Sequence, residues 1–336
     1  MKLNTLTCAV AAVAIGATGF FVGRDASTLL PSLSLQLYQW DSEASDTWPS
    51  PFVRVEISRA DKTTQPAYYL SAPQGDPKPL VVSLHTWSGD YTQHDPLAPL
   101  IQQAGWNYIH PNAQGPNNTP NACLSDRVIH DIDDAIQFAL DQGHVDAKNI
   151  FVVGASGGGY TALGAYLRSR HTVRAYLAWV PISNLLAWFH QAPYHNEQYA
   201  NDILACTDSR NGTLNEDEAK RRSPLYWPLP DKLPQRIELY AGIDDGHTGA
   251  VPISHTINFY NRIAGALGHD QNRVTEAAAT QLLTRAIDRT LTVGVLGDRG
   301  VFYQQDTGPV SLSIFDGGHE LLPAYSVARM RGMVGE

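Results

Sequence analysis

The fold is decided by the stretch Ile150-Phe151-Val152-Val153-Gly154-Ala155-Ser156-Gly157-Gly158-Gly159-Tyr160. Its first four residues are apolar and of strand length, they run into a G-x-S-x-G motif, and residues 162–168 have helical spacing. Such a motif holds its serine out of a sharp turn, where side chains at positions 154 or 158 would collide with neighbouring backbone. A phosphate-binding loop would need a lysine after its glycines, and none follows here. Ser156 is therefore the candidate nucleophile.

Short runs on both sides of this motif predict the rest of a sheet. Residues 52–57, 67–70 and 80–84 are alternating or apolar and are separated by turn-forming clusters, so they predict opening antiparallel strands. From residue 106 onward strands alternate with helices, which predicts an α/β fold with a mostly parallel central sheet and helices on both faces. The expected strands are 106–110, 150–153, 175–180, 237–241 and 310–315, and the expected helices are 126–140 and 162–168.

Composition and length favour one catalytic domain at residues 52–336. The 336 residues are 43% apolar and 17% charged, which suffices for one large core. Residues 27–51 are rich in Ser, Asp, Trp and Pro and predict an irregular N-terminal segment. Residues 183–234 carry aromatics, prolines and charges without a clean period, so we expect a small cap insertion there. The net charge of −9 argues against nucleic acid as a partner.

Residues 1–26 have the outline of an export signal. Lys2 precedes an almost uncharged apolar stretch at residues 6–22. The stretch is at the lower limit for spanning a bilayer of roughly 30 Å. A cleaved signal peptide and a retained membrane anchor therefore both remain open, and we expect an exported protein, periplasmic or secreted. Cys8 precedes most of the apolar stretch, whereas a lipidated cysteine should follow it.

An oxidising compartment would allow the two remaining cysteines to pair. A disulfide between Cys123 and Cys206 is consistent with export. Two isolated buried thiols are the alternative, because the sequence does not show whether the Cα atoms approach within about 7 Å.

A serine hydroxyl needs an imidazole to take its proton, and in sites of this kind the acid and the histidine follow the serine in the chain. The stretch Ile314-Phe315-Asp316-Gly317-Gly318-His319-Glu320 places a histidine on a glycine turn after the last expected strand. His247 and His255 also follow Ser156, but they lie beside the candidate acid rather than after a separate strand. His319 is therefore the candidate base.

The candidate acid follows the expected strand 237–241, in Gly242-Ile243-Asp244-Asp245-Gly246. A carboxylate there would orient the imidazole and stabilise its positive charge. Neighbouring side chains on an extended turn point in opposite directions, so only one of the two can face His319. Asp245 is favoured because the following glycine allows a tight return of the chain, and Asp244 stays open as the alternative.

The negative oxygen of a tetrahedral intermediate needs preplaced N–H donors, one from the residue after the nucleophile and one from an earlier loop. Gly157 supplies the first. The expected strand 80–84 runs into His85-Thr86-Trp87-Ser88-Gly89-Asp90, and the Trp87 amide is the candidate for the second. This chemistry calls for neither a metal nor another cofactor.

Together these motifs resemble the α/β-hydrolase superfamily of serine hydrolases, in its prolyl-oligopeptidase-like and dienelactone-hydrolase-like branch. Within that branch the chain is similar to bacterial carbohydrate esterases. The resemblance covers about residues 52–322 and implies the α/β-hydrolase fold with a triad of Ser156, Asp245 and His319. Two features depart from the family: Thr86 stands where a glycine is common, and residues 273–305 exceed a simple helix-to-strand crossover. The resemblance is carried by residues 84–90, 115–118, 154–160, 242–247 and 317–320.

Polar and aromatic residues near the expected site suggest substrate contacts. Asn117 and Asn118 follow a strand that should open onto the same face as Ser156, although turn residues of this kind also satisfy their own backbone. Four aromatic side chains offer stacking surface for a sugar or aryl ring, or else pack in the core: Trp87, Tyr160, Trp188 and Tyr194.

The leading hypothesis is a serine esterase acting on an acylated saccharide or another small polar ester through an acyl-enzyme. A serine peptidase of the prolyl-oligopeptidase-like type is the alternative, since it uses the same triad. It would want a propeller domain or an acidic pair to hold a peptide amine, and the sequence has no room for a propeller. A non-catalytic binding protein on the same scaffold would predict a broken triad, whereas every member is present in order.

Overall fold

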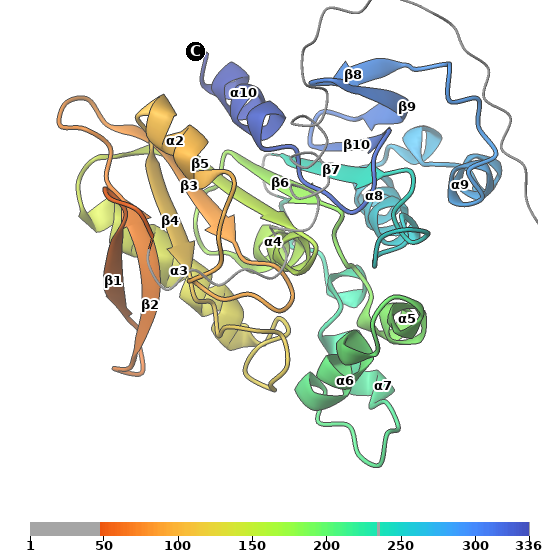
Figure 1. The fold of residues 1–336 in the computed structure, drawn as a ribbon, viewed down its shortest axis with the longest axis horizontal. Coiled ribbons are helices and arrows are strands. Elements are labelled where there is room, and N and C mark those ends of the chain that lie inside the picture. The colour runs from red at the N-terminus through yellow and green to blue at the C-terminus, as the bar shows by residue number, and fades with distance from the viewer. Residues whose placement is uncertain (1–47, 234–235, 336) are drawn as a thin grey trace, which may run out of the picture.

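A computed structural model describes residues 48–233 and 236–335 of the protein. They form a ten-stranded sheet in the order β1-β2-β4-β3-β5-β6-β7-β10-β9-β8 (Figure 1). The strands are β1 (Val53–Ser58), β2 (Thr64–Leu70), β3 (Lys78–Leu84), β4 (Asn107–Pro111), β5 (Val145–Ala155), β6 (Ala175–Trp179), β7 (Ile237–Gly242), β8 (Gly294–Leu296), β9 (Arg299–Asp306) and β10 (Val310–Phe315).

The centre of the sheet is parallel and its two edges are antiparallel. Strands β4, β3, β5, β6, β7 and β10 pair in parallel, whereas β1 and β2 at one edge and β9 and β8 at the other run antiparallel to their neighbours. The mostly parallel α/β-hydrolase sheet expected from the sequence is therefore confirmed. Because the carboxyl ends of the parallel strands share one edge, the turns that follow β3, β5, β7 and β10 open on the same side.

Helices cover both faces of the sheet. Alternate residues of β3 divide between them: Leu80 and Val82 belong to the core that contains α3, α4 and α8, and Val81 belongs to the core that contains α2 and α10. The helices are α2 (Ala98–Ala104), α3 (Asp126–Asp141), α4 (Gly157–Arg168), α5 (Leu185–Gln191), α6 (Glu197–Cys206), α7 (Glu216–Arg221), α8 (Ser254–Ala266), α9 (Glu276–Leu283) and α10 (Pro323–Val334).

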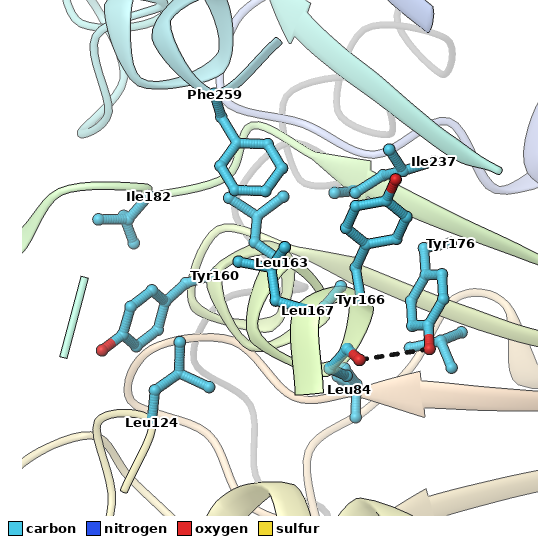
Figure 2. Close-up of a cluster of buried hydrophobic side chains, with 14 of the residues drawn as sticks. Leu84, Leu124, Tyr160, Leu163, Tyr166, Leu167, Tyr176, Ile182, Ile237 and Phe259 are labelled. Atoms are coloured by element: carbon cyan, nitrogen blue, oxygen red, sulfur yellow. Dashed lines mark hydrogen bonds between the residues drawn. The ribbon is translucent and has the colours of Figure 1, made fainter. Parts of the chain in front are cut away.

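Helix α4, which follows the candidate nucleophile, is buried along almost its whole length. Figure 2 shows its side chains Tyr160, Leu163, Tyr166 and Leu167 within a cluster of buried apolar residues, and Phe259 of α8 joins the same cluster. Close packing along the whole helix therefore holds its N-terminal turn, which carries the candidate nucleophile, in a fixed position.

Helices α5, α6 and α7 form a cap between β6 and β7, and Figure 1 shows them together to one side of the sheet. The cap is joined to the body by a disulfide. Cys206, the last residue of α6, is bonded to Cys123 in the loop before α3, with Cα atoms 6.1 Å apart. These three helices fall within residues 183–234, the segment for which the sequence predicts a small cap insertion.

The segment 273–305, which exceeds the usual crossover, folds into α9 and the β8–β9 hairpin. The hairpin pairs with β10 and extends the sheet beyond its last parallel strand. Strand β5 begins at Val145, five residues before the expected start, because its first half is exposed and lacks an apolar signal. Helix α4 begins at Gly157 instead of residue 162, since the glycines of the turn form its first turn despite their poor helix propensity.

The predicted export segment at residues 1–26 and most of the segment 27–51 lie outside the described residues. None of the helices in residues 48–233 and 236–335 combines the length and hydrophobicity that crossing a bilayer requires.

Candidate active site

Ser156 occupies the turn between β5 and α4 with backbone angles of φ 56° and ψ −118°. A non-glycine residue at positive φ is strained, and the conformation directs the side chain out of the turn. The glycines beside it are required: a Cβ on Gly154 would lie 2.3 Å from the Gly158 carbonyl oxygen, and one on Gly158 would lie 2.3 Å from the Leu84 carbonyl oxygen. The Ser156 amide donates to the Trp179 carbonyl of β6 at 3.0 Å, which ties the turn to the sheet.

Asp245 and His319 meet beyond the ends of β7 and β10. His319 Nδ1 lies 2.8 Å from Asp245 Oδ2. The carboxylate accepts a hydrogen bond from the Nδ1–H group, so Nε2 is the ring nitrogen with the free lone pair that can act as a base. Asp245 is 2% exposed, and its other oxygen accepts from the Gly246 and Val251 amides. The carboxylate is therefore held by backbone on one side and orients the imidazole on the other.

Asp244 faces the opposite way, as alternation on an extended turn requires. Its carboxylate receives hydrogen bonds from Arg289 and from Arg285, the latter at 3.3 Å. The hydrogen bond from Arg289 is the main cause that lowers the pKa of Asp244, with Arg285 acting in the same direction. The arginines come from the long segment 273–305, so Asp244 anchors that insertion while Asp245 meets the histidine.

The register of the parallel strands places the three candidate residues at one edge of the sheet. Ala155 of β5 pairs with Trp179, Trp179 with Tyr240, and Tyr240 with Ser313. Ser156 therefore begins its turn at the level where β7 and β10 are about to end, and the turns carrying the acid and the histidine extend past that level.

The two candidate oxyanion donors are next to each other. A Cβ placed on Gly157 would lie 2.3 Å from the backbone nitrogen of Trp87, so only a glycine lets the two backbones approach this closely. The loop before Trp87 is held by Gln93, whose Oε1 accepts from the Thr86 amide and whose Nε2 donates to the Thr86 hydroxyl, both at 2.8 Å. Sequence reasoning missed Gln93, which carries no motif of its own.

The alternative histidines serve the scaffold. His247 Nε2 lies 2.9 Å from the Leu283 carbonyl at the end of α9. His255 is buried, its Nδ1 accepts from the Ser183 amide, and its Nε2 lies 2.9 Å from Gln191 Oε1. Burial lowers the pKa of His255 to about 3, so the ring is neutral and joins α8 to the cap.

The expected substrate contacts are mostly internal. Asn117 is buried, and both ends of its side-chain amide have internal partners: the oxygen accepts from the Cys123 amide and the nitrogen donates to the Trp87 carbonyl. Trp87, Tyr160 and Trp188 are buried as well, so they pack rather than offer a stacking surface. Tyr194 in the cap is 87% exposed.

A cavity of about 720 Å³ adjoins His319. It is bounded by the turns after β7 and β10, by the start of β9 and by the beginning of cap helix α6. The residues that line it are polar or small, and they include His195, Asn196, Tyr199, Asp244, Thr248, Gly249, Ala250, Arg299, Asp316, Gly317, Gly318, His319 and Glu320. Across the described part of the chain, no group of three or more His, Cys, Asp or Glu residues is arranged to hold a metal ion.

The model of the prolyl oligopeptidase family matches residues 117–276, which include Ser156 and Asp245. The dipeptidyl peptidase family member 6 of Caenorhabditis elegans is 22% identical over 182 residues, covering 50% of this chain and 24% of that protein. The chain thus spans about a quarter of the length of this curated relative.

Solved structures share the fold at low sequence identity. The acylaminoacyl peptidase of Pyrococcus horikoshii superposes with a TM-score of 0.58 at 15% identity, covering 84% of this chain and 40% of that one. A puromycin-hydrolysing peptidase of Mycobacterium tuberculosis superposes with a TM-score of 0.55 at 16% identity, covering 83% and 38%. Prolyl oligopeptidase B of Galerina marginata gives 0.52 at 17%, covering 67% and 33%.

Proposed function

We propose that this chain is a serine hydrolase of the α/β-hydrolase superfamily and that it cleaves peptide bonds as a serine peptidase. The observation that carries the proposal is the contact between His319 Nδ1 and the buried Asp245 carboxylate, beyond the same sheet edge as the strained Ser156 turn. The match to the prolyl oligopeptidase family and the peptidases among its structural neighbours support a peptide rather than another acyl substrate.

The proposed reaction uses only groups of this chain. His319 Nε2 takes the hydroxyl proton of Ser156 as its oxygen attacks the carbonyl carbon, and Asp245 stabilises the imidazolium that forms. The Gly157 and Trp87 amides donate to the developing oxyanion. His319 then protonates the departing amine, and a water activated by the same imidazole hydrolyses the acyl-enzyme.

The cavity beside His319 supports a polar substrate of peptide size. At about 720 Å³ it falls within the range of pockets that hold small ligands or short peptide segments. Its lining combines one arginine with three carboxylates, the charged groups Arg299, Asp244, Asp316 and Glu320. Each carboxylate has an arginine partner: Glu320 accepts from Arg299 at 3.0 Å, and Asp244 and Asp316 lie beside Arg289.

Ester hydrolysis, which the sequence alone puts first, would use the same acyl-enzyme. None of the relatives named above is an esterase, so we rank it second. We also propose export through residues 1–26, which the Cys123–Cys206 disulfide supports because such bonds persist in oxidising compartments.

A substrate panel separates the two acyl substrates. Purified protein is offered N-blocked peptide p-nitroanilides of varied sequence, feruloyl and acetyl saccharide esters, and p-nitrophenyl acetate, with Ser156→Ala as the blank. We expect kcat/KM on the order of 10⁴ M⁻¹ s⁻¹ or higher for at least one peptide anilide. Turnover of esters with no release of p-nitroaniline from any peptide would reverse the ranking.

A further inference from the structure

We propose that Asp202, on cap helix α6, is a positioning residue that holds the Trp87 amide in its oxyanion-binding orientation. The inference rests on the proposed function, because it assigns a task to a residue outside the triad for that same reaction. Asp202 Oδ2 accepts from the Trp87 indole Nε1–H at 3.1 Å, across 115 residues of sequence. The indole belongs to the residue whose backbone N–H borders Gly157.

The carboxylate of Asp202 is buried with neutral partners. The residue is 6% exposed, and its second oxygen accepts from Gln198 Nε2 at 2.7 Å. Within residues 48–233 and 236–335, no Lys, Arg or His nitrogen lies within 4.0 Å of the carboxylate. Burial of a charge without a cationic partner is costly, and an apolar side chain would serve packing better. The carboxylate therefore acts as a directional acceptor for the indole.

The carbonyl, the indole N–H and the ring of Trp87 all have partners in the protein. Its carbonyl accepts from the Asn117 amide at 2.9 Å and from the Asn117 side chain at 3.3 Å. Its ring packs edge-on against Trp188 of the cap, with centroids 4.7 Å apart, and lies 5.9 Å from the ring of Tyr160 in α4. With the carbonyl and the indole both hydrogen-bonded, the backbone of Trp87 is held in one orientation beside Gly157.

The position of the cap is coupled to the Trp87 amide through helix α6. Helix α6 ends at Cys206, which is bonded to Cys123, and the Cys123 amide donates to Asn117 Oδ1 at 2.9 Å. The same helix thus reaches Trp87 from two sides, through Asp202 at the indole and through the disulfide and Asn117 at the carbonyl. On this proposal the cap takes part in transition-state stabilisation, because its helix α6 holds the residue that supplies the second oxyanion donor.

The test compares Asp202→Ala with Asp202→Asn on p-nitrophenyl acetate, a substrate that peptidase and esterase mechanisms both accept. We expect Asp202→Ala to lower kcat about 10- to 100-fold and to leave KM within about twofold of wild type. The loss in kcat should be smaller than the roughly 10²- to 10³-fold loss caused by deleting an oxyanion donor outright. Asp202→Asn keeps an acceptor for the indole if the Gln198 amide turns over, and should recover kcat to within about threefold of wild type. Asp217→Asn, which removes an exposed carboxylate of cap helix α7, is the matched control and should leave kcat unchanged.

A second readout separates positioning from general loosening of the fold. A peptidyl trifluoromethyl ketone adds to the serine and places its oxyanion in the hole, so its Ki should rise by the same factor by which kcat/KM falls. Trp87→Phe removes the indole donor while keeping the backbone amide, and it should reproduce both effects if Asp202→Ala does not fold. If Asp202→Ala or Trp87→Phe keeps the wild-type kcat and Ki, the proposal is wrong. Failure of the proposed function is distinct, because wild type would then release no p-nitroaniline from the peptide panel, whereas the comparison of Asp202 variants on p-nitrophenyl acetate would still be measurable.

Discussion

The strand-end turns and the cap differ in what holds them in place. In the turns after β5 and β7, backbone groups and glycines fix the geometry: Ser156 donates its amide to β6, and Asp245 accepts two amides from its own turn. The cap is fixed by side chains that reach across the chain, such as Arg222, which donates to the carbonyls of residues 120, 122 and 123. The turns that carry Ser156 and Asp245 are therefore held mainly by backbone groups, while the position of the cap depends on long-range side-chain contacts.

The largest effect is expected from removing the hydroxyl of the candidate nucleophile, Ser156. Ser156→Ala deletes the nucleophile, and we expect kcat to fall by roughly 10⁶ while the protein keeps its fold. The comparison is between steady-state kinetics and the thermal midpoint of the two proteins. Activity above a tenth of wild type would show that the strained turn is not the reacting one.

The two neighbouring carboxylates give the next largest effect and the sharpest contrast. Asp245→Asn should lower kcat by about 10⁴, because the amide favours the wrong tautomer of His319. Asp244→Asn should change kcat less than about threefold, since its partners are arginines of the insertion. Kinetics of both variants under one set of conditions provide the check, and a larger loss at position 244 would reverse the assignment.

Removing the disulfide between the cap and the body should lower the stability of the fold. Cys206→Ser opens a link between residues 83 apart in sequence, and loss of such a bridge destabilises a fold by roughly 2–4 kcal/mol. Chemical denaturation of the variant and of wild type, each without reductant, measures the difference. An unchanged midpoint would mean that Arg222 and the buried packing of α6 hold the cap unaided.

The smallest effect is expected for His255, which joins helix α8 to the cap and should make the stability of the fold depend on pH. The pKa of His255 lies near 3 in the folded state because of burial, and about 6.5 when unfolded. Its contribution to stability is therefore complete above about pH 6.5 and is lost as the pH falls towards 3. His255→Asn keeps an acceptor for the Ser183 amide, and its thermal midpoint should drop less than that of wild type between pH 7.5 and 5. Parallel curves for the two proteins would contradict this.

The contrast between local backbone structure and long-range side-chain contacts also explains what the sequence could predict. The strand-to-helix turn at Ser156, the glycine turn at His319 and the parallel core follow from local patterns of apolar residues and glycines, and the structure has them. Alternation of side chains along the turn predicts that only one of Asp244 and Asp245 faces His319, and the glycine after Asp245 favoured the residue that the structure pairs with it. Gln93 and Asp202 carry no local signal, because their roles depend on residues 7 and 115 positions away that fold beside them. Asn117 looked like a substrate contact because its internal partners are equally invisible in sequence.

The most direct test of the central claim is the site and rate of labelling by a fluorophosphonate probe. We predict that the probe modifies wild type at Ser156, located by mass spectrometry of the peptide, and that His319→Ala labels at least about 10³ times more slowly. Modification of another residue, or equal labelling rates in wild type and His319→Ala, would contradict a serine activated by the imidazole that Asp245 holds.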